Sequence, residues 1–202
     1  MVSFHDQFVQ HAPSGFEVPD ALAQAWAFME SRGWGGIGAD DEPFLTPYPG
    51  ESQLGPVFST RLSIRGWLDP DAPGAERLVP IAETDGAGGL ALIWIDDQGE
   101  HRFVGLSSDG GGGLRLADTA LDFLRLLAIG YEEFNEFAFG EEPYVDPEDD
   151  EEDDPVAAHA EFRAWVESTF EVDVPPSWDV EQDEAFDGWL TPLVEQYGLG
   201  FD

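Results

Sequence analysis

The sequence predicts an α+β fold, in which helices pack on a central antiparallel sheet. Three observations lead to this prediction. Short apolar runs separated by turn residues fill the centre of the chain, helical patterns flank them on both sides, and a block of acidic residues follows. We therefore expect a domain over residues 1–140, an acidic linker over 141–154, and a helical C-terminal extension over 155–202 that packs on the domain.

The first helix is expected over Val18–Gly33. Its apolar residues recur at helical spacing, Pro19 lies in the first turn where its missing N–H costs little, and Gly33 is placed to end the helix. A stretch rich in proline and glycine follows from Trp34 to Pro56. It contains one short strand candidate, Phe44–Tyr48.

The central residues predict neighbouring antiparallel strands. The most strand-like run is Leu90–Ile95 (LALIWI), in which alternation places Trp94 on the opposite face to Ile93 and Ile95. Four turn residues then predict a hairpin with a return strand at His101–Leu106, and such short connections favour a meander over a βαβ unit. The other strand candidates are Val57–Ser59, Leu62–Leu68 and Arg77–Thr84.

A second glycine-rich loop, Ser107–Gly113, precedes a strongly helical pattern. Asp118 is expected to be the N-cap of this helix, whose apolar stripe includes Leu121, Leu124 and Leu127. The aromatic-rich residues Tyr131–Phe139 predict a second short helix against the core.

The composition then changes abruptly, because ten of the fourteen residues from Glu141 to Asp154 are acidic. A block of like charges repels itself and is typical of a solvated linker. Pro155 can open the next helix, which is expected to run to about Phe170. The tail Glu171–Asp202 is acidic as well, but its many aromatic residues indicate that it docks on the domain.

The composition excludes several kinds of chemistry. The chain has no lysine and no cysteine, and its eight arginines face 43 Asp and Glu residues, for a net charge of -35. Schiff-base lysines, Walker lysines, thiolate nucleophiles and cysteine zinc sites are therefore impossible. The charge repels nucleic acid and anionic membranes and attracts basic partners, although an acidic proteome in the source would produce the same charge.

No motif selects a reaction or a cofactor. The four histidines (His5, His11, His101, His159) form no metal-binding pattern, and neither glycine cluster has the lysine or the following helix that phosphate loops need. The acidic run lacks the spacing of a calcium loop. We therefore expect neither an enzyme nor a bound metal or cofactor.

The N-terminal residues carry no basic segment followed by an apolar stretch, and no apolar run approaches the roughly 18 residues of a membrane helix. These features predict a soluble cytoplasmic protein.

Residues 78–133 contain an ordered series of short motifs. They are Val79-Pro80-Ile81-Ala82, the turn Asp85-Gly86-Ala87-Gly88, the strand Leu90 to Asp96, the return strand Arg102 to Leu106, and the helix start Asp118 to Leu124. In this order and spacing, the motifs resemble those of the SUKH superfamily. The resemblance implies a single SUKH-like domain and a binding protein. Many bacterial members are cytoplasmic immunity proteins that neutralise a toxin, often a nuclease.

The charge agrees with that implication, because a nuclease must hold a polyanion and so presents a basic face. The leading hypothesis is an immunity or antitoxin-type protein that occludes a basic cognate toxin and contacts neither nucleic acid nor membrane directly. A DNA mimic and a regulatory scaffold with several weak partners remain alternatives.

The candidate partner-binding residues are exposed acids near the turns and in the linker, with two tryptophans as anchors if they are exposed. Ordinary turn chemistry is the alternative for each acid, and a place in the core is the alternative for each tryptophan. The candidates are Asp96, Asp97, Glu100, Asp109, Trp67, Trp94, Asp149, Asp150, Glu151 and Glu152.

Overall fold

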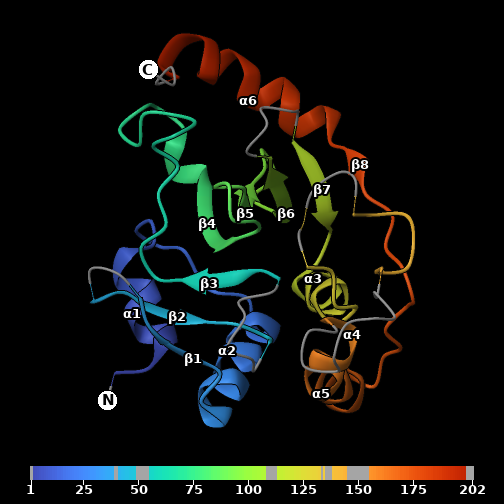
Figure 1. Ribbon diagram of the computed structural model, residues 1–202. Coiled ribbons are helices and arrows are strands. Elements are labelled where there is room, and N and C mark those ends of the chain that lie inside the picture. Colours follow the sequence, from blue (N-terminus) through green and yellow to red (C-terminus); the bar gives the residue numbers. More distant parts are fainter. Residues whose placement is uncertain are drawn as a thin grey trace.

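The computed structural model describes residues 2–38, 41–48, 55–107, 113–132, 134, 138–144 and 155–198. It shows an α+β fold built on an antiparallel sheet of eight strands that follow one another in chain order (Figure 1). The strands are β1 (Gly35–Ile37), β2 (Pro43–Leu45), β3 (Val57–Ser59), β4 (Leu78–Glu83), β5 (Leu90–Ile95), β6 (His101–Leu106), β7 (Leu114–Ala117) and β8 (Glu181–Gln182). Within the described part, the α-helices are α1 (Phe4–His11), α2 (Asp20–Arg32), α3 (Ala120–Leu127), α4 (Pro155–Ala158), α5 (Ala160–Phe170) and α6 (Glu184–Tyr197).

Strand β5 is apolar throughout because both faces of the sheet are covered. Ala91 and Ile93 belong to a first apolar cluster, whereas Leu92 and Trp94 belong to a second. The predicted alternation along this strand is therefore confirmed. The register with β6 is regular over all six residue pairs, from Leu90 opposite Leu106 to Ile95 opposite His101.

Helices from both ends of the chain cover the first face. Trp26 of α2 is fully buried and makes edge contacts with Phe4 of α1 and with Phe58 of β3. Phe123 of α3 stacks on Phe103 of β6, and α5 contributes Phe162 to the same cluster. The predicted packing of helices on the sheet is thus present on this face.

Helix α6 lies across the second face, opposite the other helices (Figure 1). Phe186 is fully buried against Trp94, with ring centroids 5.2 Å apart, and Trp189 lies 5.7 Å from the same indole. The segment between β3 and β4 contributes Ile64 and Leu68 to the same cluster. The aromatic residues of the tail therefore pack on the sheet, and two residues of the tail, β8, pair with β7.

The helix ends follow the local sequence. Gly33 ends α2 in the left-handed conformation that glycine adopts without steric cost. The N-cap of α3 is Thr119, whose side chain accepts a hydrogen bond from the N–H of Asp122. The prediction of Asp118 as N-cap was wrong by one residue, because the Asp118 carboxylate binds Arg102 and Arg115 instead.

One other prediction is corrected. Leu62–Leu68 is not a strand: Trp67 and Leu68 both donate backbone hydrogen bonds to Ile64, which closes a turn and directs Ile64 and Leu68 into the second cluster. The helix predicted over Tyr131–Phe139 falls partly outside the described residues, at 133 and 135–137, and the described residues of this range are not helical. The helix predicted from Pro155 is present as α4 and α5, interrupted at His159.

Five short elements had no counterpart among the predictions. These are α1, β1, β7, β8 and a 3₁₀ helix over Ala75–Arg77. The acidic linker lies largely outside the described residues, so the proposed division into domain, linker and extension stays a prediction.

Replacing Phe186 by alanine is expected to lower the free energy of unfolding by about 3–5 kcal/mol, because it removes the buried ring between α6 and Trp94 and leaves a cavity. Val194→Ala on the same helix is the control. It removes a side chain that is 37% exposed and should cost less than about 1 kcal/mol. Urea denaturation of both variants measures the difference, and equal costs would show that α6 is not part of the core.

Candidate functional site

The site is built on the turn between β5 and β6, where Asp96 organises the backbone. One carboxylate oxygen of Asp96 accepts hydrogen bonds from the backbone N–H groups of Gln98 and Glu100, each at 2.9 Å. Gly99 adopts a positive φ of 80°, which a glycine tolerates at this point of a hairpin. The predicted hairpin turn is therefore confirmed, and its shape is fixed by a side chain of the turn itself.

The second oxygen of Asp96 contacts Arg102, with 3.2 Å between Oδ2 and Nε. Burial would raise the pKa of Asp96, but the N–H groups of Glu100 and Gln98 and the Arg102 guanidinium outweigh burial and lower the pKa. The Asp96 side chain is only 6% exposed. Both carboxylate oxygens of Asp96 are therefore engaged within the chain, which agrees with ordinary turn chemistry, and a role of Asp96 in partner binding stays a prediction.

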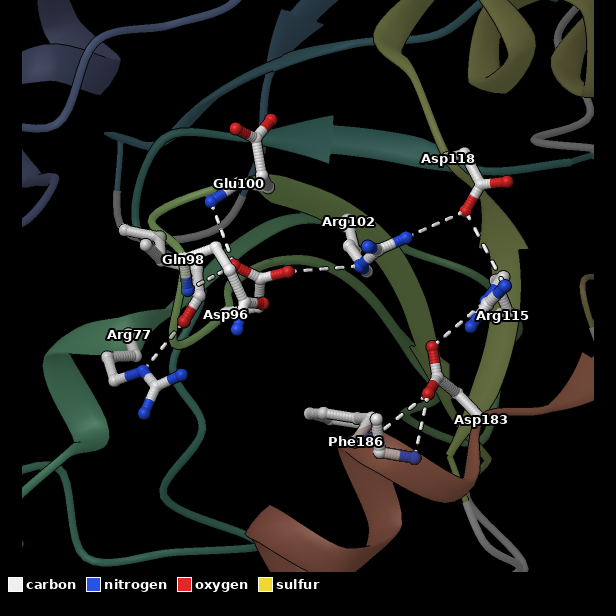
Figure 2. A network of polar contacts seen from close by, with 11 residues as sticks. Arg77, Asp96, Gln98, Glu100, Arg102, Arg115, Asp118, Asp183 and Phe186 are labelled. Carbon is white, nitrogen blue, oxygen red and sulfur yellow. Dashed lines mark hydrogen bonds and ion pairs between the residues drawn. The ribbon is translucent and has the colours of Figure 1, made fainter.

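Arginines and carboxylates continue from Asp96 across the sheet edge to α6 (Figure 2). Arg102 binds Asp118 at 3.1 Å, Asp118 lies 3.7 Å from Arg115, and Arg115 binds Asp183 at 3.0 Å. Asp183 is the N-cap of α6 and accepts hydrogen bonds from the first N–H groups of that helix. The chain of charges thus connects the hairpin, β7 and the start of α6.

Asp183 holds the α6 end of this chain. Its side chain is fully buried, and burial would raise its pKa, but Arg115 and the N–H groups of Phe186 and Ala185 lower the pKa below its usual value. The same contact with Asp183 raises the pKa of Arg115. Asp183 is therefore ionised in the folded protein at neutral pH.

Arg77 ties the hairpin to α6 by a second route. Its Nε donates to the carbonyl of Ile95 at 2.6 Å, and its Nη1 lies 2.9 Å from Asp97. The guanidinium also lies over the rings of Trp189, at 4.8 Å, and Trp94, at 5.8 Å. Arg77 therefore neutralises one acid of the turn and holds the turn against the second apolar cluster.

A hollow of about 550 Å³ opens beside this hairpin, and we call it the hairpin hollow. The imidazole of His101 stacks on Phe16 at its wall, with centroids 5.4 Å apart. Two exposed acids, Glu17 and Glu76, face one arginine, Arg77, whose charge Asp97 balances. The lining residues are Pro13, Ser14, Gly15, Phe16, Glu17, Glu76, Arg77, Ile95 and His101.

The structure brings together only some of the candidate residues. Asp97 and Glu100 are exposed beside the hairpin hollow, and the Glu100 carboxylate points away from the arginine chain (Figure 2). Trp94 is a core residue under α6, and Trp67 is half-buried at the edge of the second cluster. The candidates Asp109, Asp149, Asp150, Glu151 and Glu152 lie outside the described residues.

Sequence reasoning missed the far wall of the hollow. The hairpin register places His101 opposite Ile95, so these two lining residues could have been paired from the predicted turn. Nothing in the sequence signals that residues 13–17, which follow α1, come back to the same place. Glu17 and Glu76 were therefore not distinguished from the many other acids.

Among the described residues, no group of three or more histidine, aspartate and glutamate side chains could hold a metal ion. No helix in the described part is long and apolar enough to cross a membrane. Comparisons with family models, curated proteins and solved structures found no match.

Asp183→Asn is expected to lower the free energy of unfolding at pH 7 by about 1–2 kcal/mol, because asparagine caps a helix but lacks the charge that binds Arg115. A lowered folded pKa stabilises the fold above the unfolded pKa of about 3.9 and loses that effect as the pH falls through the folded pKa. The difference between wild type and variant should therefore shrink below about pH 4.

Urea denaturation of both proteins from pH 7 to pH 2.5 measures this difference directly. Acidification also weakens the repulsion among the other carboxylates, and this changes the free energy of unfolding of both proteins equally. Taking the difference between the two proteins at each pH removes that contribution. A difference that stays constant over the whole range would show that the charge of Asp183 contributes nothing.

Proposed function

We propose that this chain is an immunity-type binding protein with a SUKH-like fold, and that it occludes the basic face of a cognate toxin without catalysing a reaction. One observation carries the proposal. Six of the eight arginines form ion pairs with carboxylates of the chain in its described part, so they add no free positive charge to the surface (Arg32, Arg77, Arg102, Arg115, Arg125 and Arg163). The remaining acids act on the surroundings as a strong negative field.

Such a field favours fast capture of a basic protein. Complementary charge raises association rates and orients the encounter, and it suppresses binding to acidic partners. An inhibitor of a toxin must act before the toxin reaches its substrate. Speed of association is therefore a property that this charge would provide.

The hairpin hollow is the part of the surface that we expect to receive a basic side chain of the partner. Glu17 and Glu76 lie beside an apolar wall that contains Phe16 and Ile95. A lysine or arginine of a partner could pack its aliphatic stem on that wall and pair its charge with the two acids. Anchors that fill a pocket near the centre of an interface supply much of the binding energy.

The order of elements within residues 78–127 supports the family resemblance. Strand β4 leads through the Asp85 turn to β5, β6 returns beside it, and α3 follows after β7. The Asp85 carboxylate accepts hydrogen bonds from the N–H groups of Ala87 and Gly89, so the Asp-Gly turn of the motif has a defined structural role.

The direct test co-expresses this chain with the product of the adjacent upstream gene. We expect a stable complex in gel filtration and rescue of cells from the toxicity of that product. The absence of both would overturn the proposal. Displacement of DNA from an unrelated basic protein, with no complex formed, would instead favour a DNA mimic.

The double variant Glu17→Gln/Glu100→Gln is expected to slow association with the captured toxin by about 3- to 10-fold at low salt, because it removes two exposed acids beside the hollow. Glu142→Gln/Glu195→Gln changes the net charge equally at exposed positions elsewhere and should alter the rate less than about twofold. Stopped-flow measurements at two salt concentrations compare the pairs. Equal slowing would show that only net charge matters and that the hairpin is not the docking site.

A further inference from the structure

We infer that a second hollow binds a small zwitterion with an apolar side chain, of which a free α-amino acid is the simplest example. This hollow has a volume of about 410 Å³ and is separate from the hairpin hollow, with which it shares no lining residue. We call it the Arg61 hollow. Its lining residues are Glu42, Arg61, Leu62, Ser63, Gly66, Trp67, Glu83, Ala87, Gly88 and Leu90.

The charges that line the Arg61 hollow are opposite but not joined. Arg61 faces the same space as Glu42 and Glu83, yet no ion pair within 4.0 Å links it to any carboxylate of the described residues. Six other arginines do form such pairs in a chain that has an excess of acids. A separated cation and anion across a hollow can each bind the complementary charge of one ligand.

The carboxylate of Glu42, the backbone of Glu83 and the turn beside this hollow are held in place. Ser59 donates a hydrogen bond to Glu42, and Glu83 ends the paired strand β4. The turn that contains Ala87 and Gly88 is closed by Asp85, and Thr84 donates to the carbonyl of Gly89 at 2.9 Å. The Glu42 carboxylate and the backbone frame of the hollow are therefore formed before a ligand arrives, which lowers the cost of binding.

The apolar side of the Arg61 hollow continues the second core cluster. Leu90 is a buried member of that cluster, and Leu62 and Trp67 pack against its edge. An aliphatic or aromatic side chain of a ligand would extend this surface and remove apolar area from water. The hollow thus offers a contact for each of the three parts of an apolar amino acid.

The overall charge of the protein selects among ligands. At a net charge of -35 the protein repels a free anion, so a phosphate or a simple carboxylate gains little from Arg61 alone. A free cation is attracted by every exposed acid and has no reason to prefer this place. A zwitterion has no net charge to be repelled, and it uses the arginine and the glutamates together.

The test titrates the full chain with L-leucine, L-methionine and L-phenylalanine and follows its amide resonances by NMR. We expect saturable shifts at residues of the Arg61 hollow with at least one of them. N-acetyl-L-leucine lacks the ammonium group and L-leucinamide lacks the carboxylate, so each should bind at least tenfold more weakly than L-leucine. Absence of saturable shifts with all three amino acids, or equal binding of the blocked forms, would overturn the inference.

Arg61→Gln tests the cation, and Arg65→Gln is the matched control. Arg65 is also exposed, belongs to the same segment and forms no ion pair with a described residue, but it does not line the hollow. We expect R61Q to weaken amino acid binding at least tenfold and R65Q to change it less than twofold. Equal effects would assign the binding to charge in general. The comparison of blocked ligands on the unaltered protein decides the question even if R61Q does not fold.

Discussion

Burial of both faces of the central strands is the constraint on which the rest of the structure depends. The first face is covered by residues of α1, α2, α3 and α5, whereas the second needs α6, which follows the last strand of the sheet. A protein of charge -35 repels itself, so this packing must outweigh a standing electrostatic cost. Two charged contacts hold α6 on the sheet: the guanidinium of Arg77 lies over Trp189, and Asp183 at the start of the helix pairs with Arg115. The two hollows lie at the margins of this arrangement.

Several strands of the fold could be predicted from local sequence. The bounds of β3, β5 and β6 were predicted as observed, because their apolar runs end at turn residues and need little help from distant contacts. Strands β1, β7 and β8 have two to four residues and exist only because a neighbouring strand supplies their partners. Residues 62–68 showed apolar side chains at alternating positions, but a hydrogen-bonded turn at Ile64 replaced the strand. Tertiary pairing decided the short strands β1, β7 and β8, whereas a local turn decided residues 62–68.

The candidate site could be predicted only in part, because contacts between distant parts of the chain also decide which of its side chains are exposed. The hairpin turn indicates by itself that Asp97 and Glu100 reach solvent, since turn tips are exposed. It does not indicate that the carboxylate of Asp96 accepts hydrogen bonds from the backbone of the turn and pairs with Arg102. The burial of Trp94 depends on its contact with Phe186, more than ninety positions later in the chain. Alternation along a strand predicts the face on which a side chain lies, but not which element covers that face.

The arrangement of acids at the hairpin favours a protein partner over mimicry of DNA. A duplex carries about one charge per 1.7 Å along its axis, so a mimic needs a long and regular series of unpaired carboxylates. The acids of the hairpin region are instead divided: Asp96 and Asp97 are bound to arginines of the chain, and Glu17 and Glu76 flank an apolar hollow. An apolar wall has no counterpart in a phosphate backbone, but it suits the stem of a basic side chain. The distribution of free and paired acids, more than their number, therefore supports the binding of a protein surface.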